Sequence, residues 1–125
     1  MAANGDRLLV LDGDRIAIRH RATTYVVARD EVTCARAAKN GTWIVTNRGQ
    51  FKVREPMNSV VDKLAIIGVV RIHRAIAVNG DKVRSLLGRS QHRLAVILDG
   101  DECFEVGRQF QRAIRMRFGA ARRAS

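Results

Sequence analysis

The chain has 125 residues, a length that suits one domain and is too short for two of ordinary size. Hydrophobic residues make up 46% of it and charged residues 28%, which predicts a folded globular domain and excludes a disordered polyelectrolyte. Lys and Arg number 23 against 12 Asp and Glu, and the resulting net charge of +11 predicts a polyanionic partner.

Signals for membranes, export and metals are missing from the sequence. The longest apolar run, from Leu64 to Val70, is interrupted by Gly68 and is too short to span a bilayer. The first residues lack the basic and apolar regions of a signal peptide, so we expect a cytoplasmic location and no membrane contact by this chain. Cys34 and Cys103 form no CxxC pair and have no nearby His, so we expect two buried thiols and no metal.

Turn signals occur along the whole chain and mark the ends of short strands. Asx-Gly pairs, which favour tight turns between strands, occur at Asn4-Gly5, Asp12-Gly13, Asn40-Gly41, Asn79-Gly80 and Asp99-Gly100, with Asn47-Arg48-Gly49 as a looser relative. Apolar and polar residues alternate over 15–19, 25–27, 34–36, 43–45 and 50–53. This alternation predicts half-buried strands joined by hairpin turns.

A short helix interrupts the strands in the middle of the chain. Met57, Val60, Val61 and Leu64 recur at the spacing i, i+3, i+4 and i+7 after Pro56, which suits a first helical position. The spacing predicts an amphipathic helix over 56–64.

Strands resume after this helix, and a second helix ends the chain. Two strands, 69–72 and 76–78, flank a polar bend at 73–75, and a further hairpin joins 94–98 to 104–106. From Gly107 onward, Phe110, Ile114 and Phe118 recur at helical spacing among arginines. The chain is therefore predicted to be mostly β, with one short internal helix and a C-terminal helix.

No known catalytic signature appears in the sequence. His20, His73 and His92 fall in no metal-ligand spacing, and no serine-nucleophile, Walker or dinucleotide-binding motif is present. We therefore expect a binding protein that is not an enzyme and that needs no cofactor.

Basic side chains gather at three places where strands turn or a helix starts. The three clusters are Lys39 with Asn40 at a hairpin tip, Arg71 with His73 and Arg74 in the bend, and Arg108 with Gln109 and Arg112 before the last helix. Each combines a cation with an amide or an imidazole, groups that contact phosphates and purine edges. The alternative for each is an ordinary turn or a solvated strand face. Aromatic residues, at 5%, are too few to stack single strands.

Several segments resemble, in order and spacing, the LytTR family of bacterial DNA-binding domains. They are 30–37, 39–43, the helix at 56–64, 70–79, 81–83 and 98–108. Arg71, His73, Arg74, Val78 and Asn79 stand at the positions of the family's most specific stretch, and Val106 and Arg108 match its second stretch. Ala75 and Gly107 stand where the family commonly has Ser. The resemblance extends from about Asp30 to Ile114.

This resemblance implies antiparallel strands in small stacked sheets that lie along a duplex, with loops entering successive major grooves of promoter direct repeats, often as a dimer. The DNA-facing residues that it implies are Lys39, Asn40, Thr42, His73, Arg74 and Arg108 with its neighbours. Members are usually output domains of response regulators or other sensor proteins, so a receiver or sensor module outside this chain is compatible with it.

The sequence thus predicts a single domain, recognisable over about 15–118 and followed by a basic tail at 119–125. We expect it to bind duplex DNA as a transcriptional regulator or as the DNA-binding domain of one. The alternative is a basic, non-enzymatic module that binds structured RNA or a ribonucleoprotein. Both neutralise phosphates, so salt dependence alone does not separate them.

Overall fold

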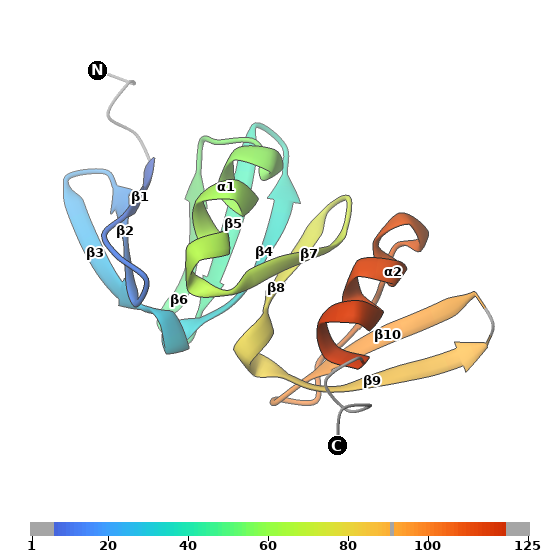
Figure 1. Ribbon diagram of the computed structural model, residues 1–125. Coiled ribbons are helices and arrows are strands. Elements are labelled where there is room, and N and C mark those ends of the chain that lie inside the picture. The colour runs from blue at the N-terminus through green and yellow to red at the C-terminus, as the bar shows by residue number, and fades with distance from the viewer. Residues whose placement is uncertain (1–6, 91, 120–125) are drawn as a thin grey trace.

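A computed structural model describes residues 7–90 and 92–119, and three antiparallel sheets make up most of the fold (Figure 1). The first sheet, ordered β1-β2-β3, contains β1 (Arg7–Val10), β2 (Arg15–His20) and β3 (Thr23–Ala28). The central sheet, ordered β6-β5-β4-β8-β7, contains β4 (Val32–Ala38), β5 (Gly41–Thr46), β6 (Gly49–Val53), β7 (Val69–His73) and β8 (Ile76–Asn79). The third, ordered β11-β10-β9, contains β9 (Val83–Ser90), β10 (Arg93–Leu98) and β11 (Cys103–Glu105). The prediction of a mostly β fold is confirmed.

Both predicted helices are present. The helix α1 (Met57–Leu64) runs into a 3-10 turn, η3 (Ala65–Ile67), and α2 (Gln111–Ile114) lies between the 3-10 turn η5 (Arg108–Phe110) and the π-helical turn η6 (Arg115–Gly119). Two further 3-10 turns are η2 (Arg29–Glu31) and η4 (Gly80–Lys82). Pro56 is extended and serves as the N-cap of α1, one residue before the helical position that the sequence suggested.

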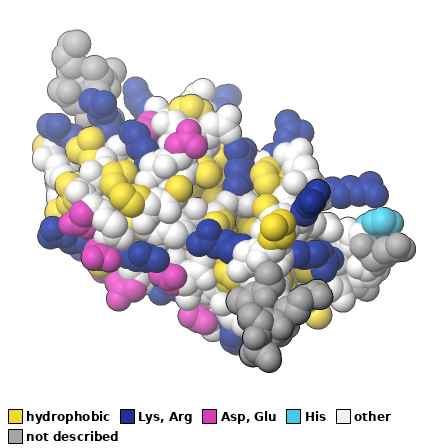
Figure 2. Space-filling model, viewed as in Figure 1, with side chains coloured by type: hydrophobic (Ala, Val, Ile, Leu, Met, Phe, Trp, Pro, Cys, Tyr) yellow, Lys and Arg dark blue, Asp and Glu magenta, His cyan; other side chains and the backbone are white. Residues whose placement is uncertain are grey.

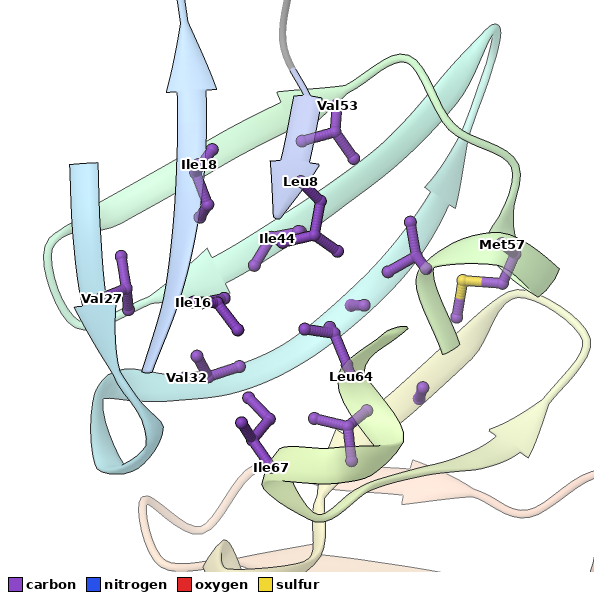
Figure 3. Packing of buried hydrophobic residues seen from close by; sticks show 14 residues of the cluster. Leu8, Ile16, Ile18, Val27, Val32, Ile44, Val53, Met57, Leu64 and Ile67 are labelled. Atoms are coloured by element: carbon purple, nitrogen blue, oxygen red, sulfur yellow. The ribbon is translucent and has the colours of Figure 1, made fainter. Parts of the chain in front are cut away.

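Two hydrophobic cores lie on opposite faces of the central sheet. The first is enclosed by the first sheet, the central sheet and α1, and Figure 3 shows its side chains converging from all three. The second lies between the central sheet, the third sheet and the C-terminal helical segment. Neighbouring residues of β4 and β8 alternate between the cores: Ala35 and Ala77 belong to the first, Cys34 and Val78 to the second. Covering on both faces explains why these strands are apolar almost throughout.

The two cysteines differ in exposure, which corrects the expectation that both are buried. Cys34 is buried, and this burial raises the pKa of its thiol to about 11, with Glu102 adding to the rise and Arg36 opposing it. Cys103 is exposed on β11, where its neighbour Phe104 packs against the second core. Because side chains alternate along a strand, Cys103 points outward.

Most of the predicted Asx-Gly turns join the two strands of a hairpin, but one does not. Those at 12–13, 40–41 and 99–100 join β1 to β2, β4 to β5 and β10 to β11, and 47–49 joins β5 to β6. Asn79 is instead fully buried, and its amide donates to the carbonyls of Arg29 (3.0 Å) and Val32 (2.8 Å) while its oxygen accepts from the Asp81 N–H (3.0 Å). It thus caps η4. Residues 4–5 and the basic tail beyond Gly119 lie outside the described residues.

Two strands, β1 and β9, have no clear signal in the sequence. Leu8, Leu9 and Val10 follow one another in β1, and Leu86, Leu87 and Gly88 do so in β9, so neither strand shows the alternation of a half-buried strand. Antiparallel pairing holds them: β1 pairs with β2, and β9 pairs with β10 along its length. Their strand conformation depends on these partners.

Candidate nucleic-acid interface

Three segments far apart in sequence lie at one end of the central sheet. They are the turn between β4 and β5, the turn between β7 and β8, and the start of the C-terminal helical segment. The Ala37 N–H donates to the Ala75 carbonyl (2.8 Å), and the Gly107 N–H donates to the Ile72 carbonyl (2.7 Å). In Figure 1 all three segments lie along the upper edge. The fold therefore brings the three predicted basic clusters together.

The turn between β4 and β5 presents a cation and an amide. Asn40 adopts a left-handed conformation (φ 63°), which Asn tolerates better than most residues. Gly41 follows where a Cβ would lie 2.3 Å from the Val53 carbonyl oxygen, so only glycine fits. Lys39 and Asn40 are both exposed, and neither side chain has a hydrogen-bond or ion-pair partner among residues 7–90 and 92–119.

Thr42 belongs to the interior and not to this edge. It is fully buried, and its hydroxyl donates to the Glu55 carbonyl (2.8 Å). Because this bond holds β5 against the segment that leads into α1, Thr42 has a structural role. The expectation that Thr42 faces DNA is not met, and we leave it out of the interface.

The turn between β7 and β8 projects an imidazole and a guanidinium. A register shift between Arg71 and His73 forms a bulge that redirects the side chains at the end of β7. His73 Nδ1 accepts the Ala75 N–H (3.1 Å), so the neutral ring carries its proton on Nε2, where it can donate. Arg74 is exposed, and its side chain has no partner within the described part of the chain.

Arg71 differs from the other cations of this edge, because its guanidinium is engaged within the protein. Nε donates to the His73 carbonyl (3.2 Å), and the two terminal nitrogens donate to Asn58 Oδ1 and to the Arg74 carbonyl. Its Cζ lies 5.8 Å from the centroid of the Phe110 ring. Asn58 and Phe110 were not among the residues predicted for this edge, because an exposed Asn in a helix and an apolar residue at helical spacing carry no signal of a bond to Arg71.

The third cluster begins the C-terminal helical segment. Arg108, Gln109 and Arg112 are exposed, and their side chains have no hydrogen-bond or ion-pair partner in the regions that the structure describes. A shallow hollow of about 460 Å³ separates them from the turn between β7 and β8; it is lined by His73, His92, Glu105, Val106, Gly107, Arg108 and Gln111. A Cβ at Gly107 would lie 3.2 Å from the Phe110 ring and 3.6 Å from His73. The glycine thus leaves room for the Phe110 ring beside the start of this segment.

Charge is distributed unevenly over the molecule. Figure 2 shows Asp and Glu side chains of this face mainly at its lower left, whereas Lys and Arg side chains lie over most of it, including its upper edge and right side. Ion pairs join Arg15 to Asp12, Arg29 to Asp81, Arg48 to Glu31, Lys63 to Glu55, Arg84 to Asp101 and Arg93 to Glu105. Among the described residues, no ion pair includes a cation of the three clusters. The edge therefore keeps an uncompensated positive field.

Small antiparallel sheets with one basic edge of turns define a β-rich module suited to contact a polyanion. The family model of the LytTr DNA-binding domain matches residues 22–119, and the chain belongs to this family of DNA-binding domains. Within the described ranges, no helix is long and apolar enough to cross a membrane, and no group of three His, Cys, Asp or Glu is placed to hold a metal ion.

Two known proteins resemble the chain. The sensory transduction protein LytR of Staphylococcus haemolyticus is 27% identical over 97 residues, which are 78% of this chain and 38% of that protein. The chain therefore spans well under half of this relative. A solved LytTr DNA-binding domain from Bacillus cereus superimposes with a TM-score of 0.70 at 14% identity, over 82% of this chain and 94% of that one. This second likeness confirms the fold.

Proposed function

We propose that this domain recognises duplex DNA sequence-specifically as the DNA-binding part of a transcriptional regulator. The observation that carries the proposal is that three clusters, near positions 39, 73 and 108, share one edge and hold exposed cations without acidic partners in the described residues. Protruding turns suit the major groove, which is about 12 Å wide. The two turns and the start of the C-terminal helical segment would then enter successive grooves along one side of the duplex.

Each cluster supplies groups for phosphates and for bases. Arg74 and Arg108 can each form two hydrogen bonds with one guanine, and Asn40 can form two with one adenine. His73 offers the Nε2–H as a single donor. Lys39, Gln109 and Arg112 are assigned to phosphates, which set the register of the protein on the duplex.

The test begins with a duplex that the wild-type protein selects from a random pool. Arg74→Ala and Arg108→Ala should lower the preference for this duplex over a random one by about tenfold or more, because a bidentate base contact contributes roughly 1–3 kcal/mol. Arg84→Ala is the matched control, since Arg84 pairs with Asp101 at the turn between β10 and β11. An unchanged preference in both interface variants would remove the site assignment.

Competition between nucleic acids tests the class of partner. The major groove of A-form RNA is deep and narrow and does not admit the turns, so duplex RNA should compete poorly with duplex DNA. Equal competition by duplex RNA would favour the structured-RNA alternative.

We further infer that the free domain is a monomer that pairs on tandem half-sites. A net charge of +11 on 125 residues opposes self-association until phosphates neutralise it. Half-sites separated by about 10 base pairs, or a multiple, place both copies on one side of the duplex. Light scattering should give a monomer, and gel shifts should weaken when the spacing changes by half a turn. A stable dimer without DNA, or indifference to spacing, would contradict this.

A further inference from the structure

We propose that Arg71 is a positioning residue: it orients the turn between β7 and β8 and ties that turn to the C-terminal cluster, without itself contacting DNA. This inference rests on the proposed function and departs from the prediction that groups Arg71 with residues that face DNA. It follows from the partners of the guanidinium, which lie on three separate elements of the fold.

The first argument concerns the backbone of the turn. The Arg71 guanidinium donates to the carbonyls of both His73 and Arg74, and these two bonds fix the orientation of successive peptide planes. The next residue, Ala75, donates its N–H to His73 Nδ1 and accepts the Ala37 N–H. With these backbone groups satisfied inside the protein, the His73 Nε2–H and the Arg74 side chain remain available for a ligand.

The second argument concerns the two neighbours of the turn. Asn58 Oδ1 accepts from Arg71, which connects the turn to the first turn of α1. On the other side, the guanidinium lies over the Phe110 ring, and Phe110 packs against the second core. Phe110 follows Arg108 by two residues, so the contact also sets where the third cluster stands relative to the second.

The third argument concerns the kind of side chain that can make these hydrogen bonds and the ring contact at the same time. Arg presents a rigid planar fork whose N–H groups point in several fixed directions, and its flat face stacks on rings. A Lys ammonium is a compact point charge, which cannot reproduce the fork. A phosphate contact, by contrast, tolerates either cation. The substitution Arg71→Lys therefore separates the two roles.

The experiment compares the wild type, Arg71→Lys and Arg71→Ala on the selected duplex and on a random duplex over a series of salt concentrations. We expect both variants to lose about tenfold in the preference for the selected duplex, as when one base contact is lost. We expect the salt slope on the random duplex to stay unchanged. Arg112→Ala, the control for a phosphate contact, should make that slope less steep by about 0.9 and leave the preference intact.

Two results would overturn the inference: an Arg71→Lys protein with the wild-type preference, or an Arg71→Ala protein whose random-duplex slope becomes less steep as that of Arg112→Ala does. If Arg71→Ala does not fold, Asn58→Ala decides, since it removes one acceptor and should lower the preference in the same direction. An unchanged preference in Asn58→Ala would then reject the inference. If the wild type selects no duplex, the proposed function itself fails, which is a distinct outcome.

Discussion

At the scale of single residues, Asn79 shows how one buried side chain can join distant segments. Its amide N–H groups donate to the carbonyls of Arg29, the first residue of η2, and Val32, the C-cap of η2. Its amide oxygen accepts the Asp81 N–H and so caps η4. These bonds lie where the first sheet leads into the central one. Removing the amide would take one donor away from each carbonyl; the Arg29 carbonyl would keep the Val32 N–H, and the buried Val32 carbonyl would lose its bond to Asn79.

Asn79→Ala should therefore lower the free energy of unfolding by about 1–3 kcal/mol, the cost of leaving buried polar groups unsatisfied. Urea denaturation measures the change. Asn47→Ala is the control, because Asn47 is exposed in the turn between β5 and β6 and its replacement should cost within about 0.5 kcal/mol. Equal costs for the two variants would show that the Asn79 bonds add little.

At the scale of elements, Glu55 docks the first strand onto α1. Its carboxylate accepts from the Leu8 N–H (2.8 Å), the Ser59 hydroxyl (3.0 Å) and the Lys63 ammonium (2.7 Å). Burial by itself raises the pKa of Glu55, but the bonds from Lys63, Leu8 and Ser59 outweigh it and hold the pKa below its ordinary value. The ionised form is therefore the one that the fold stabilises.

A carboxyl whose pKa is lowered by folding adds stability above its unfolded pKa, about 4.3, and that stability is lost as the pH falls through the folded pKa. We expect the melting temperature to fall below about pH 4 and this fall to be smaller in Glu55→Gln. Thermal unfolding from pH 3 to pH 7 measures it, with the exposed Glu102→Gln as control. The same acid sensitivity in Glu55→Gln and the wild type would refute this role.

At the scale of the whole molecule, three sheets stand side by side (Figure 1). Two turns of the central sheet and the start of the C-terminal helical segment form the basic edge. If about six phosphates are neutralised along this edge, the logarithm of the binding constant should fall with the logarithm of salt concentration at a slope of roughly −5. Titrations of a fluorescent duplex at several salt concentrations give the slope. A slope near zero would contradict binding through this edge.

Several parts of the fold were predictable because they depend on local chemistry. The apolar spacing of 57–64 and of 110–118 indicates helices whatever they pack against, and Asn40-Gly41 marks a turn through its own backbone preferences. The exposure of Lys39, Arg74 and Arg108 follows from their places in turns. By contrast, β1 and β9 lack a period of their own, and their conformation comes from the strands with which they pair.

The sequence by itself determined the mostly β class, both helices, the basic charge and the turns that carry it, since backbone preference, periodicity and net charge are properties of short segments or of composition. Only the tertiary structure decided which polar side chains form hydrogen bonds within the protein and which remain exposed. Thr42 is turned inward by its bond to the Glu55 carbonyl, and Arg71 is held by Asn58 and Phe110. These contacts join residues 13 or more positions apart. These contacts form only when the chain packs into its tertiary structure, so no pattern of neighbouring residues predicts them.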